Sequence, residues 1–249
     1  VAPHVDEHER AHRFPRPIVD RLGEMGWLGI PIPEDEGGAG LDTLAYAVAI
    51  EEIGRVWGSL GLIVAAHTSL GCGPLHLAGT AEQKQAFLVP MASGRVIGAY
   101  GLTESGAGSD AGGTRTTARL EGDTWILDGS KRFITNAGQA GTYIVTARTG
   151  ATPKGDPEIS AFIVPADTPG FSVGRLEDKL GLHASATGEL RFDGARVPAA
   201  NLLGERGGGF RTFLKVLDGG RISIGALAIG LAQAALDAAI PYAQSREQF

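Results

Sequence analysis

Residues 100–110 read Tyr-Gly-Leu-Thr-Glu-Ser-Gly-Ala-Gly-Ser-Asp, a run of small and hydroxyl-bearing residues that directly follows a short apolar segment. Glycine tolerates positive φ angles and lets a ligand come close to the backbone. Such a turn can direct several backbone N–H groups at one anion. One interpretation of this stretch is therefore a site for a phosphate-bearing ligand, and the other is an ordinary glycine-rich surface turn.

Residues 106–111 also fit the loose dinucleotide-binding pattern G-x-G-x-x-G/A, which is a weak signal when it stands alone. A dinucleotide site of that class needs a helix directly after the glycines. Residues 114–120 instead read Thr-Arg-Thr-Thr-Ala-Arg-Leu, a composition typical of a strand that leads into a turn. The context excludes that class of site.

Short segments rich in β-branched and aromatic residues lie on both sides of residues 100–110, separated by Gly, Asp and Pro. Turns are expected at residues 121–123 and 128–130, where Gly, Asp and Ser cluster. The gaps between segments are too short for βαβ crossovers, so the region predicts a mostly antiparallel β domain, a sandwich or barrel. Strands are predicted near residues 96–102, 114–120, 124–131, 142–148, 160–165 and 189–197.

Residues 17–94 show helical periodicity instead. Residues 59–77 are apolar nearly all round and predict an interior helix, and Thr80 followed by Gln83 is the pattern of a capping box that opens a short helix. Residues 41–56 predict an amphipathic helix whose apolar stripe is formed by Tyr46, Ala49, Ile50 and Ile53. This region is predicted to be a helical bundle.

Helical spacing returns from Gly208 onward, and the sequence stops at Phe249 without a Gly, Asn or Pro that would end the helix. We therefore expect an α+β multidomain protein. Its parts are an N-terminal helical domain over residues 1–95, a central β domain over residues 96–200, and the beginning of a C-terminal helical bundle over residues 201–249, with the remainder missing.

The composition narrows the classes of partner. A net charge of -6 with scattered Lys and Arg disfavours nucleic acid. No uninterrupted apolar run approaches the roughly 20 residues of a membrane-spanning helix, so no integral membrane association is expected. Cys72 is the only cysteine, which excludes a disulfide framework and suits a reducing compartment. Residues 1–10 show no secretory signal, so a cytoplasmic location is expected.

The first residues contain a formal metal-binding pattern. His4-Val-Asp-Glu-His8 matches the inverted zincin motif, and His12 is expected to extend the same helical face. A charged, solvated helix is the interpretation we adopt, because nothing in the surrounding sequence suggests an enclosed catalytic site. No metal is assigned.

Asp218 and Arg221 flank Gly219 and Gly220 at i,i+3 spacing, which places both charges on one face of a helix. A simple intrahelical ion pair is one interpretation. The two glycines would then be unexplained, since each weakens a helix interior by about 1 kcal/mol relative to alanine. The close approach of a ligand is the alternative that explains them.

Several segments, taken together and in order, resemble the acyl-CoA dehydrogenase family over nearly the whole chain. The family fold of a helical domain, a β domain and a C-terminal four-helix bundle agrees with the elements predicted above. The matching segments are residues 100–110 (YGLTESGAGSD), 131–136 (KRFITN), 179–181 (KLG), 196–198 (RVP), 203–205 (LGE), 218–221 (DGGR) and 242–249 (YAQSREQF).

The resemblance implies a flavoenzyme of fatty acid β-oxidation with FAD as cofactor. It implies α,β-desaturation of an acyl-CoA thioester to 2-enoyl-CoA, with electrons passed to an electron-transferring flavoprotein. It also implies a homotetramer or a homodimer. Residues 217–231 look nearest to the short-chain and branched-chain members of the family.

The resemblance further implies roles for individual residues. Phe133 stands where many relatives have Trp, and the Thr135 hydroxyl stands where the family places a hydrogen bond near flavin N5. The residues that would contact the CoA part of the substrate are Ser109, Asp218 and Arg221. The residues that would bind FAD are Tyr100, Leu102, Thr103, Gly108, Ser109, Phe133, Ile134 and Thr135, with Arg246 and Gln248 reaching the FAD of a neighbouring subunit.

The sequence departs from the family pattern at the catalytic base. One branch of the family has a glutamate immediately before the arginine that matches Arg221, but this chain has Gly220 there, and glycine cannot accept a proton. The base is expected beyond Phe249, and Glu104 is not assigned to that role. Two alternatives stay open: a flavin oxidase or monooxygenase of the same fold, and a non-catalytic acyl-CoA-binding scaffold.

Overall fold

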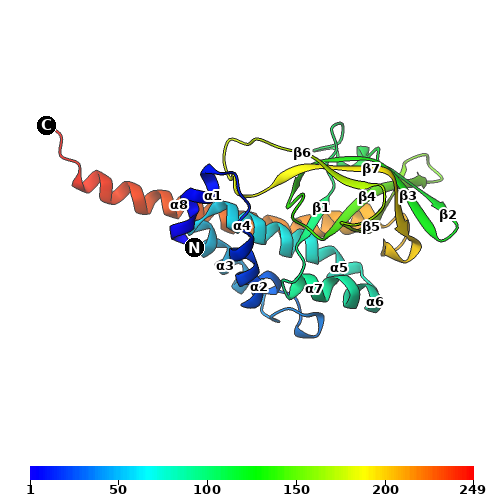
Figure 1. The fold of residues 1–249 in the computed structure, drawn as a ribbon, viewed down its shortest axis with the longest axis horizontal. Helices are drawn as coiled ribbons and strands as arrows, with labels where there is room; N and C mark the ends of the chain where they lie inside the picture. Colours follow the sequence, from blue (N-terminus) through cyan, green and yellow to red (C-terminus); the bar gives the residue numbers. More distant parts are fainter.

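A computed structural model describes residues 1–249 and divides them between a helical part and a single twisted sheet (Figure 1). The predicted interior helix is present as one continuous helical run over residues 58–78. The helices are α1 (Val5–Arg10), α2 (Arg16–Glu24), α3 (Thr43–Val56), α4 (Gly58–Ala65), the π-helical segment Ala66–Cys72, α5 (Gly73–Ala78), α6 (Ala81–Gln83), the π-helical segment Lys84–Leu88, α7 (Val89–Ala92) and α8 (Gly209–Ser245).

Local sequence signals account for several of these elements. The amphipathic pattern of residues 41–56 forms α3, which buries Tyr46, Ile50 and Ile53. The capping box is confirmed, because the Thr80 hydroxyl accepts a hydrogen bond from the Gln83 N–H while the Gln83 side chain accepts one from the Thr80 N–H. Both predictions are therefore correct.

The strands form one eight-stranded sheet, mostly antiparallel as predicted. Its order is β6-β7-β3-β2-β4-β5-β8, and β1 pairs in parallel with β4. The strands are β1 (Gly98–Gly101), β2 (Thr117–Glu121), β3 (Thr124–Thr135), β4 (Thr142–Ala151), β5 (Pro157–Pro165), β6 (Phe171–Leu176), β7 (Thr187–Pro198) and β8 (Leu202–Leu203).

Two details of the strand prediction are wrong. Residues 128–130 do not form a turn, because β3 continues through them and absorbs Gly129 as a register shift against β7. Gly129 has a φ of 141°, and a Cβ there would lie 2.7 Å from the Thr116 hydroxyl oxygen. The strands β6 and β8 were missed, β6 because it is only partly buried and carries no clean alternation.

The helical part and the sheet do not have separate cores, because each of the two buried apolar clusters contains residues from both. The larger buried cluster joins α3 and α4 to strands β3, β4 and β7. His67, fully buried in the first π-helical segment, accepts a hydrogen bond at Nδ1 from the Gly98 N–H (2.9 Å) and donates one from Nε2 to the Met91 carbonyl oxygen (3.1 Å). Burial lowers the pKa of His67 to about 4, so the ring is neutral and joins the helices to the start of β1.

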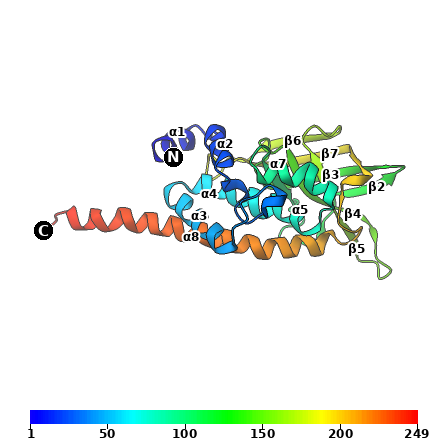
Figure 2. The ribbon, with the colours of Figure 1, turned by 90° about the horizontal axis from the view of Figure 1, so that it is seen from below.

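The helix α8 runs along one side of the molecule, from the sheet to well beyond α1 (Figure 2). It lies directly against α3, where Gly230 leaves room for the Glu51 carbonyl and Leu227 fits over Gly54. Only some of the apolar residues whose spacing predicted this helix are buried. Phe213 and Leu227 are buried, whereas Leu214, Ile222, Ile224, Leu231 and Leu236 are exposed.

Residues 58–78 and α8 are both long and apolar enough to cross a membrane by length and composition alone. We expected no uninterrupted apolar run of that length, and these two helices meet the test by their average composition instead. Most of residues 58–78 is buried in the core, which explains the apolar composition without a membrane.

The end of α1 corrects another expectation. The helix stops at Arg10, and His12 has a φ of 50°, so His12 does not continue the helical face of His4 and His8. Its ring instead lies over that of His183, with 4.2 Å between the ring centroids.

The contact between α3 and α8 makes a matched prediction about two glycines of the same helix. Gly230→Ala would place a Cβ 2.2 Å from the Glu51 carbonyl oxygen, and we expect the free energy of unfolding to fall by about 2 kcal/mol. Gly225→Ala meets nothing within 4 Å, and we expect a gain of up to about 1 kcal/mol. Urea unfolding followed by circular dichroism measures both. Equal effects of the two substitutions would contradict the close packing.

Candidate functional site

A cleft opens where β1 and the end of β3 meet the helices. It consists of two adjoining cavities, of about 180 and 310 Å³, which share Ala66, Leu70, Thr135 and Leu217 as a common wall. The first cavity is also lined by Tyr100, Leu102, Thr103, Phe133 and Ile134. The second is also lined by Leu62, Ala65, Ser69, Gly220, Arg221 and Ile224. We call these two cavities together the cleft.

One backbone hydrogen bond brings the two sequence motifs of the cleft together. The Arg132 N–H donates to the Thr103 carbonyl oxygen at 2.8 Å, just where the chain leaves β1. Residues 100–103 therefore lie beside residues 133–135, although about thirty positions separate them in sequence. The structure thus gathers six of the predicted flavin-binding residues around one cavity.

Tyr100 forms a rigid part of the cleft wall. Its ring stacks on Phe213 of α8 with 4.1 Å between centroids, and its hydroxyl donates to the Phe213 carbonyl oxygen at 3.1 Å. Burial raises the pKa of Tyr100, so its hydroxyl stays protonated at neutral pH. Tyr100 therefore shapes the cavity and fastens α8 to β1 rather than supplying a proton.

Phe133 has an unusual conformation for a residue within a strand. Its φ is 58°, and its side chain is 60% exposed because the pairing of β3 with β7 shifts register between Lys131 and Ile134. A non-glycine residue in the left-handed region costs of order 1–3 kcal/mol. In this strained conformation the flat Phe133 ring lies exposed at the opening of the first cavity. This arrangement fits a planar ring system such as a flavin.

The glycine-rich loop follows directly after Thr103, which lines the first cavity. A Cβ on Gly108 would meet nothing within 4 Å, and a Cβ on Gly106 would meet only the Arg115 guanidinium carbon, at 4.0 Å. Gly108 and Ser109 do not line either cavity, and both are exposed. The backbone of this loop is therefore accessible to an anionic group that extends out of the cleft.

A buried ion pair lies beneath the loop. The Lys131 ammonium is fully buried and contacts a Glu104 carboxylate oxygen at 2.7 Å. Burial alone would raise the pKa of Glu104, but the charge of Lys131 and hydrogen bonds from Thr114 and Thr116 outweigh it and hold the pKa at about 2. Burial lowers the pKa of Lys131 to about 8, which leaves the ammonium form predominant at neutral pH. The pair is therefore ionised.

The residues predicted to contact CoA divide between the cavity and the surface. Arg221 lines the second cavity and forms the expected intrahelical ion pair with Asp218, which does not line it. A Cβ on Gly220 would lie 3.1 Å from Leu70 Cδ2, so helix packing explains that glycine, whereas nothing lies within 4 Å of the position on Gly219. No Asp or Glu lines either cavity.

Arg246 and Gln248 lie far from the cleft. Both follow the end of α8 at Ser245 and are exposed, at the opposite end of the molecule from the sheet (Figure 1). They cannot contribute to the cleft of their own chain.

Sequence reasoning missed seven residues of the cleft, and three of them lie in the wall that the two cavities share. Ala66, Leu70 and Leu217 form most of the wall that the two cavities share. Their apolar helical spacing predicted burial, but nothing local distinguishes a residue that faces a cavity from one that faces the core. Only the packing of α8 against residues 66–72 reveals their position.

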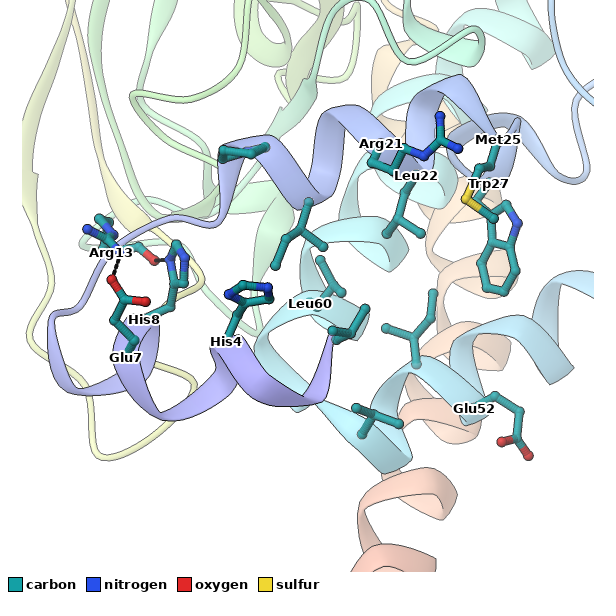
Figure 3. Close-up of a pocket in the computed structure, with 15 residues that line it drawn as sticks. His4, Glu7, His8, Arg13, Arg21, Leu22, Met25, Trp27, Glu52 and Leu60 are labelled. Atoms are coloured by element: carbon teal, nitrogen blue, oxygen red, sulfur yellow. Dashed lines mark hydrogen bonds and ion pairs between the residues drawn. The ribbon is translucent and has the colours of Figure 1, made fainter.

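A larger cavity, of about 780 Å³, lies among α1, α2 and α3 (Figure 3). Leu22, Trp27 and Leu60 are among the apolar residues that line it, and Arg13 and Glu7 form an ion pair at one end. None of the predicted site residues lines it. Size alone therefore does not identify the functional site, and we assign that role to the cleft.

Models of one protein family match nearly the whole chain. The models for the N-terminal, middle and C-terminal domains of acyl-CoA dehydrogenases match residues 1–95, 99–195 and 207–249 respectively. A probable acyl-CoA dehydrogenase of Bacillus subtilis is 53% identical over 249 residues, which are 100% of this chain and 66% of that protein. The chain thus spans slightly less than two-thirds of the length of this relative.

Solved structures give the same result. Butyryl-CoA dehydrogenase from Megasphaera elsdenii is 43% identical, with a TM-score of 0.95 over 100% of this chain and 66% of that one. An acyl-CoA dehydrogenase from Bacillus anthracis, solved in complex with FAD, is 39% identical, with a TM-score of 0.93 over 100% of this chain and 43% of that one. These likenesses extend over the helical part, the sheet and α8.

The buried ion pair makes a prediction about acid stability. The carboxyl pKa of Glu104 falls from 4.5 in the unfolded chain to about 2 in the fold, so its contribution is complete above pH 4.5 and is lost as the pH falls towards 2. The shift corresponds to roughly 3 kcal/mol. The difference in unfolding free energy between wild type and Glu104→Gln should therefore shrink over that range. A difference that stays constant from pH 5 to pH 2.5 in urea titrations would contradict this.

Proposed function

The chain belongs to the acyl-CoA dehydrogenase family, and from this premise we propose that it provides the flavin- and substrate-binding cleft of an FAD-dependent acyl-CoA dehydrogenase. The reaction is the α,β-desaturation of an acyl-CoA thioester to a 2-enoyl-CoA. The observation that carries this proposal is the position of Thr135. Its side chain lies on the wall shared by the two cavities, one with the predicted flavin residues and one with Arg221.

The residues of the first cavity fit FAD. The exposed ring of Phe133, the apolar side chains of Leu102 and Ile134, and the threonines at positions 103 and 135 supply a flat wall with two polar groups. FAD supplies the hydride acceptor, which no amino-acid side chain can provide. The accessible backbone of residues 106–109 would hold its phosphates or those of the substrate.

The second cavity suits a short acyl thioester. Its lining is mostly apolar, and Arg221 at its edge presents a cation to the phosphate-bearing part of CoA. The likeness to butyryl-CoA dehydrogenase favours a short acyl chain. Desaturation also needs hydrogen-bond donors at the thioester oxygen, because an α-C–H group is a poor acid and the developing enolate must be stabilised.

The proton acceptor is not one of the cleft residues. Neither cavity contains a carboxylate, and Gly220 occupies the position where one branch of the family has its glutamate. We propose that the base is a glutamate beyond Phe249. Glu104 is excluded, because its carboxylate is buried against Lys131 and does not line the cleft.

We also propose that the electrons pass to an electron-transferring flavoprotein and that the protein works in the cytoplasm as a homotetramer or homodimer. The remote position of Arg246 and Gln248 supports the oligomer, since residues that bind FAD from that end of the molecule can only serve another subunit. A flavin oxidase of the same fold is the alternative.

Anaerobic titration of the purified, yellow protein with acyl-CoA thioesters of different lengths tests the function. We expect bleaching of the flavin absorbance, strongest with short chains, and slow return of the colour in air. Fast reoxidation with peroxide formation would favour the oxidase. A colourless protein that does not take up added FAD would overturn the proposal.

Thr135→Val should leave FAD bound but slow flavin reduction by about 10²-fold or more, the usual cost of losing one preorganised donor. Stopped-flow measurement of flavin bleaching provides the rate. Thr124→Val, at the other end of the same strand and outside both cavities, is the matched control and should leave the rate within a few fold. Unchanged kinetics in Thr135→Val would remove Thr135 from the mechanism.

Arg246→Ala should weaken FAD retention in the assembled oligomer without changing the fold, because Arg246 is exposed and contacts nothing in its own cleft. The ratio of flavin to protein absorbance after gel filtration measures the retention. Arg211→Ala, at the opposite end of α8, is the control. Full flavin occupancy in the Arg246 variant would argue against a role across the subunit interface.

A further inference from the structure

A single carboxylate joins the two ends of the glycine-rich loop. One Glu104 oxygen accepts hydrogen bonds from the Thr114 hydroxyl (2.6 Å) and the Thr116 N–H (3.1 Å), and the other accepts one from the Arg115 N–H (2.7 Å). Glu104 lies where the loop begins, and residues 114–116 lie where it returns to the sheet. Residues 105–113 therefore form a loop whose two ends are held together by the Glu104 side chain.

Lys131 connects Glu104, and with it the two ends of the loop, to the strands of the cleft. Its ammonium donates to Glu104 (2.7 Å), to the Leu102 carbonyl oxygen (3.2 Å) and to the Thr146 hydroxyl (3.1 Å). Lys131 itself belongs to β3, two residues before Phe133. The pair thus connects the end of β1, β3 and β4 to the loop at one point.

Stability alone does not explain why charges are buried here. Replacing a buried ion pair by apolar residues of similar volume is often neutral or stabilising, because both charges lose their hydration. An apolar pair, however, could not accept the three donors of residues 114–116. The carboxylate is therefore suited to setting the geometry of the returning chain.

We propose that Glu104 and Lys131 are positioning residues that hold the backbone of residues 105–109 for phosphate groups and keep Thr103 beside Phe133. The proposal rests on the proposed function for the identity of the ligand. Neither residue lines the cleft, so both act through the residues they hold. The phosphates can belong to FAD or to the CoA thioester, and the experiments below separate the two.

Hydrogen exchange of the protein without FAD tests the positioning directly. Peptides from residues 104–116 are compared in wild type, Glu104→Gln, Lys131→Met and the double variant. We expect exchange at least about tenfold faster in each variant, the effect of losing a hydrogen bond to a charged group. Peptides from α3 and α8 should not change. Loop exchange at the wild-type rate would overturn the proposal.

The double variant separates positioning from stability. It leaves no unpaired buried charge, so its melting temperature should recover towards wild type relative to the two single variants. Its loop exchange should stay fast, and its affinity for the phosphate ligand that the loop holds, FAD or acyl-CoA, should stay about tenfold or more weaker than that of wild type. Recovery of both FAD and acyl-CoA affinity together with the melting temperature would mean that the pair is merely structural, and would overturn the proposal.

Two substrates distinguish the source of the phosphates. If the loop holds CoA, the KM for an acyl-CoA should rise in Glu104→Gln while the KM for the matching acyl-pantetheine, which lacks the nucleotide, stays the same. If it holds FAD, the dissociation constant of FAD should rise and the two KM values should change together. Unchanged FAD affinity with both KM values unchanged would overturn the proposal.

Matched controls complete the design. Arg119→Gln removes an exposed ion pair with Asp128 on the same sheet and should change none of these quantities. Thr114→Val removes one donor to Glu104 and one acceptor of Lys131 but keeps the ion pair, so it should give a smaller increase in loop exchange. It keeps the test available if the charge variants do not fold. Wild type that fails to bind FAD would refute the proposed function, while the exchange measurement would still decide on the positioning.

Discussion

The cleft depends on the junction between the end of β1 and the end of β3. The Arg132 N–H bonds to the Thr103 carbonyl at 2.8 Å, and the Lys131 ammonium bonds to the Leu102 carbonyl at 3.2 Å. Backbone polar groups at such a buried junction must find partners, because leaving one unsatisfied costs about 1–3 kcal/mol. With these groups paired, Phe133 can leave the ladder of β7 and face outward. The wall of the cleft thus results from the hydrogen bonds that join the end of β1 to the end of β3.

Much of the fold could be predicted from local pattern. The stripe of α3, the apolar run of residues 58–78 and the capping box at Thr80 each followed from spacing that the structure preserves. The predicted turn at residues 128–130 was wrong, because a glycine with positive φ can serve either in a hairpin turn or in a bulge within a strand. Gly129 sits between Asp and Ser, as in a hairpin turn, yet its positive φ serves a register shift within one strand. Only the partner strand β7 decides between the two.

The candidate site was predictable in part, for a similar reason. Motif resemblance named the residues at 100–103 and 133–135, which the structure places around one cavity. It could not name Leu70 or Leu217, because an apolar residue on a helix gives no sign of facing a cavity rather than the core. Glu104 was read only as a possible base and set aside. Its buried partner Lys131, 27 residues away, became visible only in the fold.

The wall of the cleft is drawn from segments that the ribosome makes at very different times. Ala66 emerges early, whereas Leu217 and the Phe213 ring that stacks on Tyr100 emerge about 150 residues later, after roughly ten seconds or more of synthesis. Earlier segments can form helices and strands, but they cannot enclose a ligand. Cofactor capture must therefore await the first turns of α8, and a nascent chain that stalls before them has no closed cleft to fill.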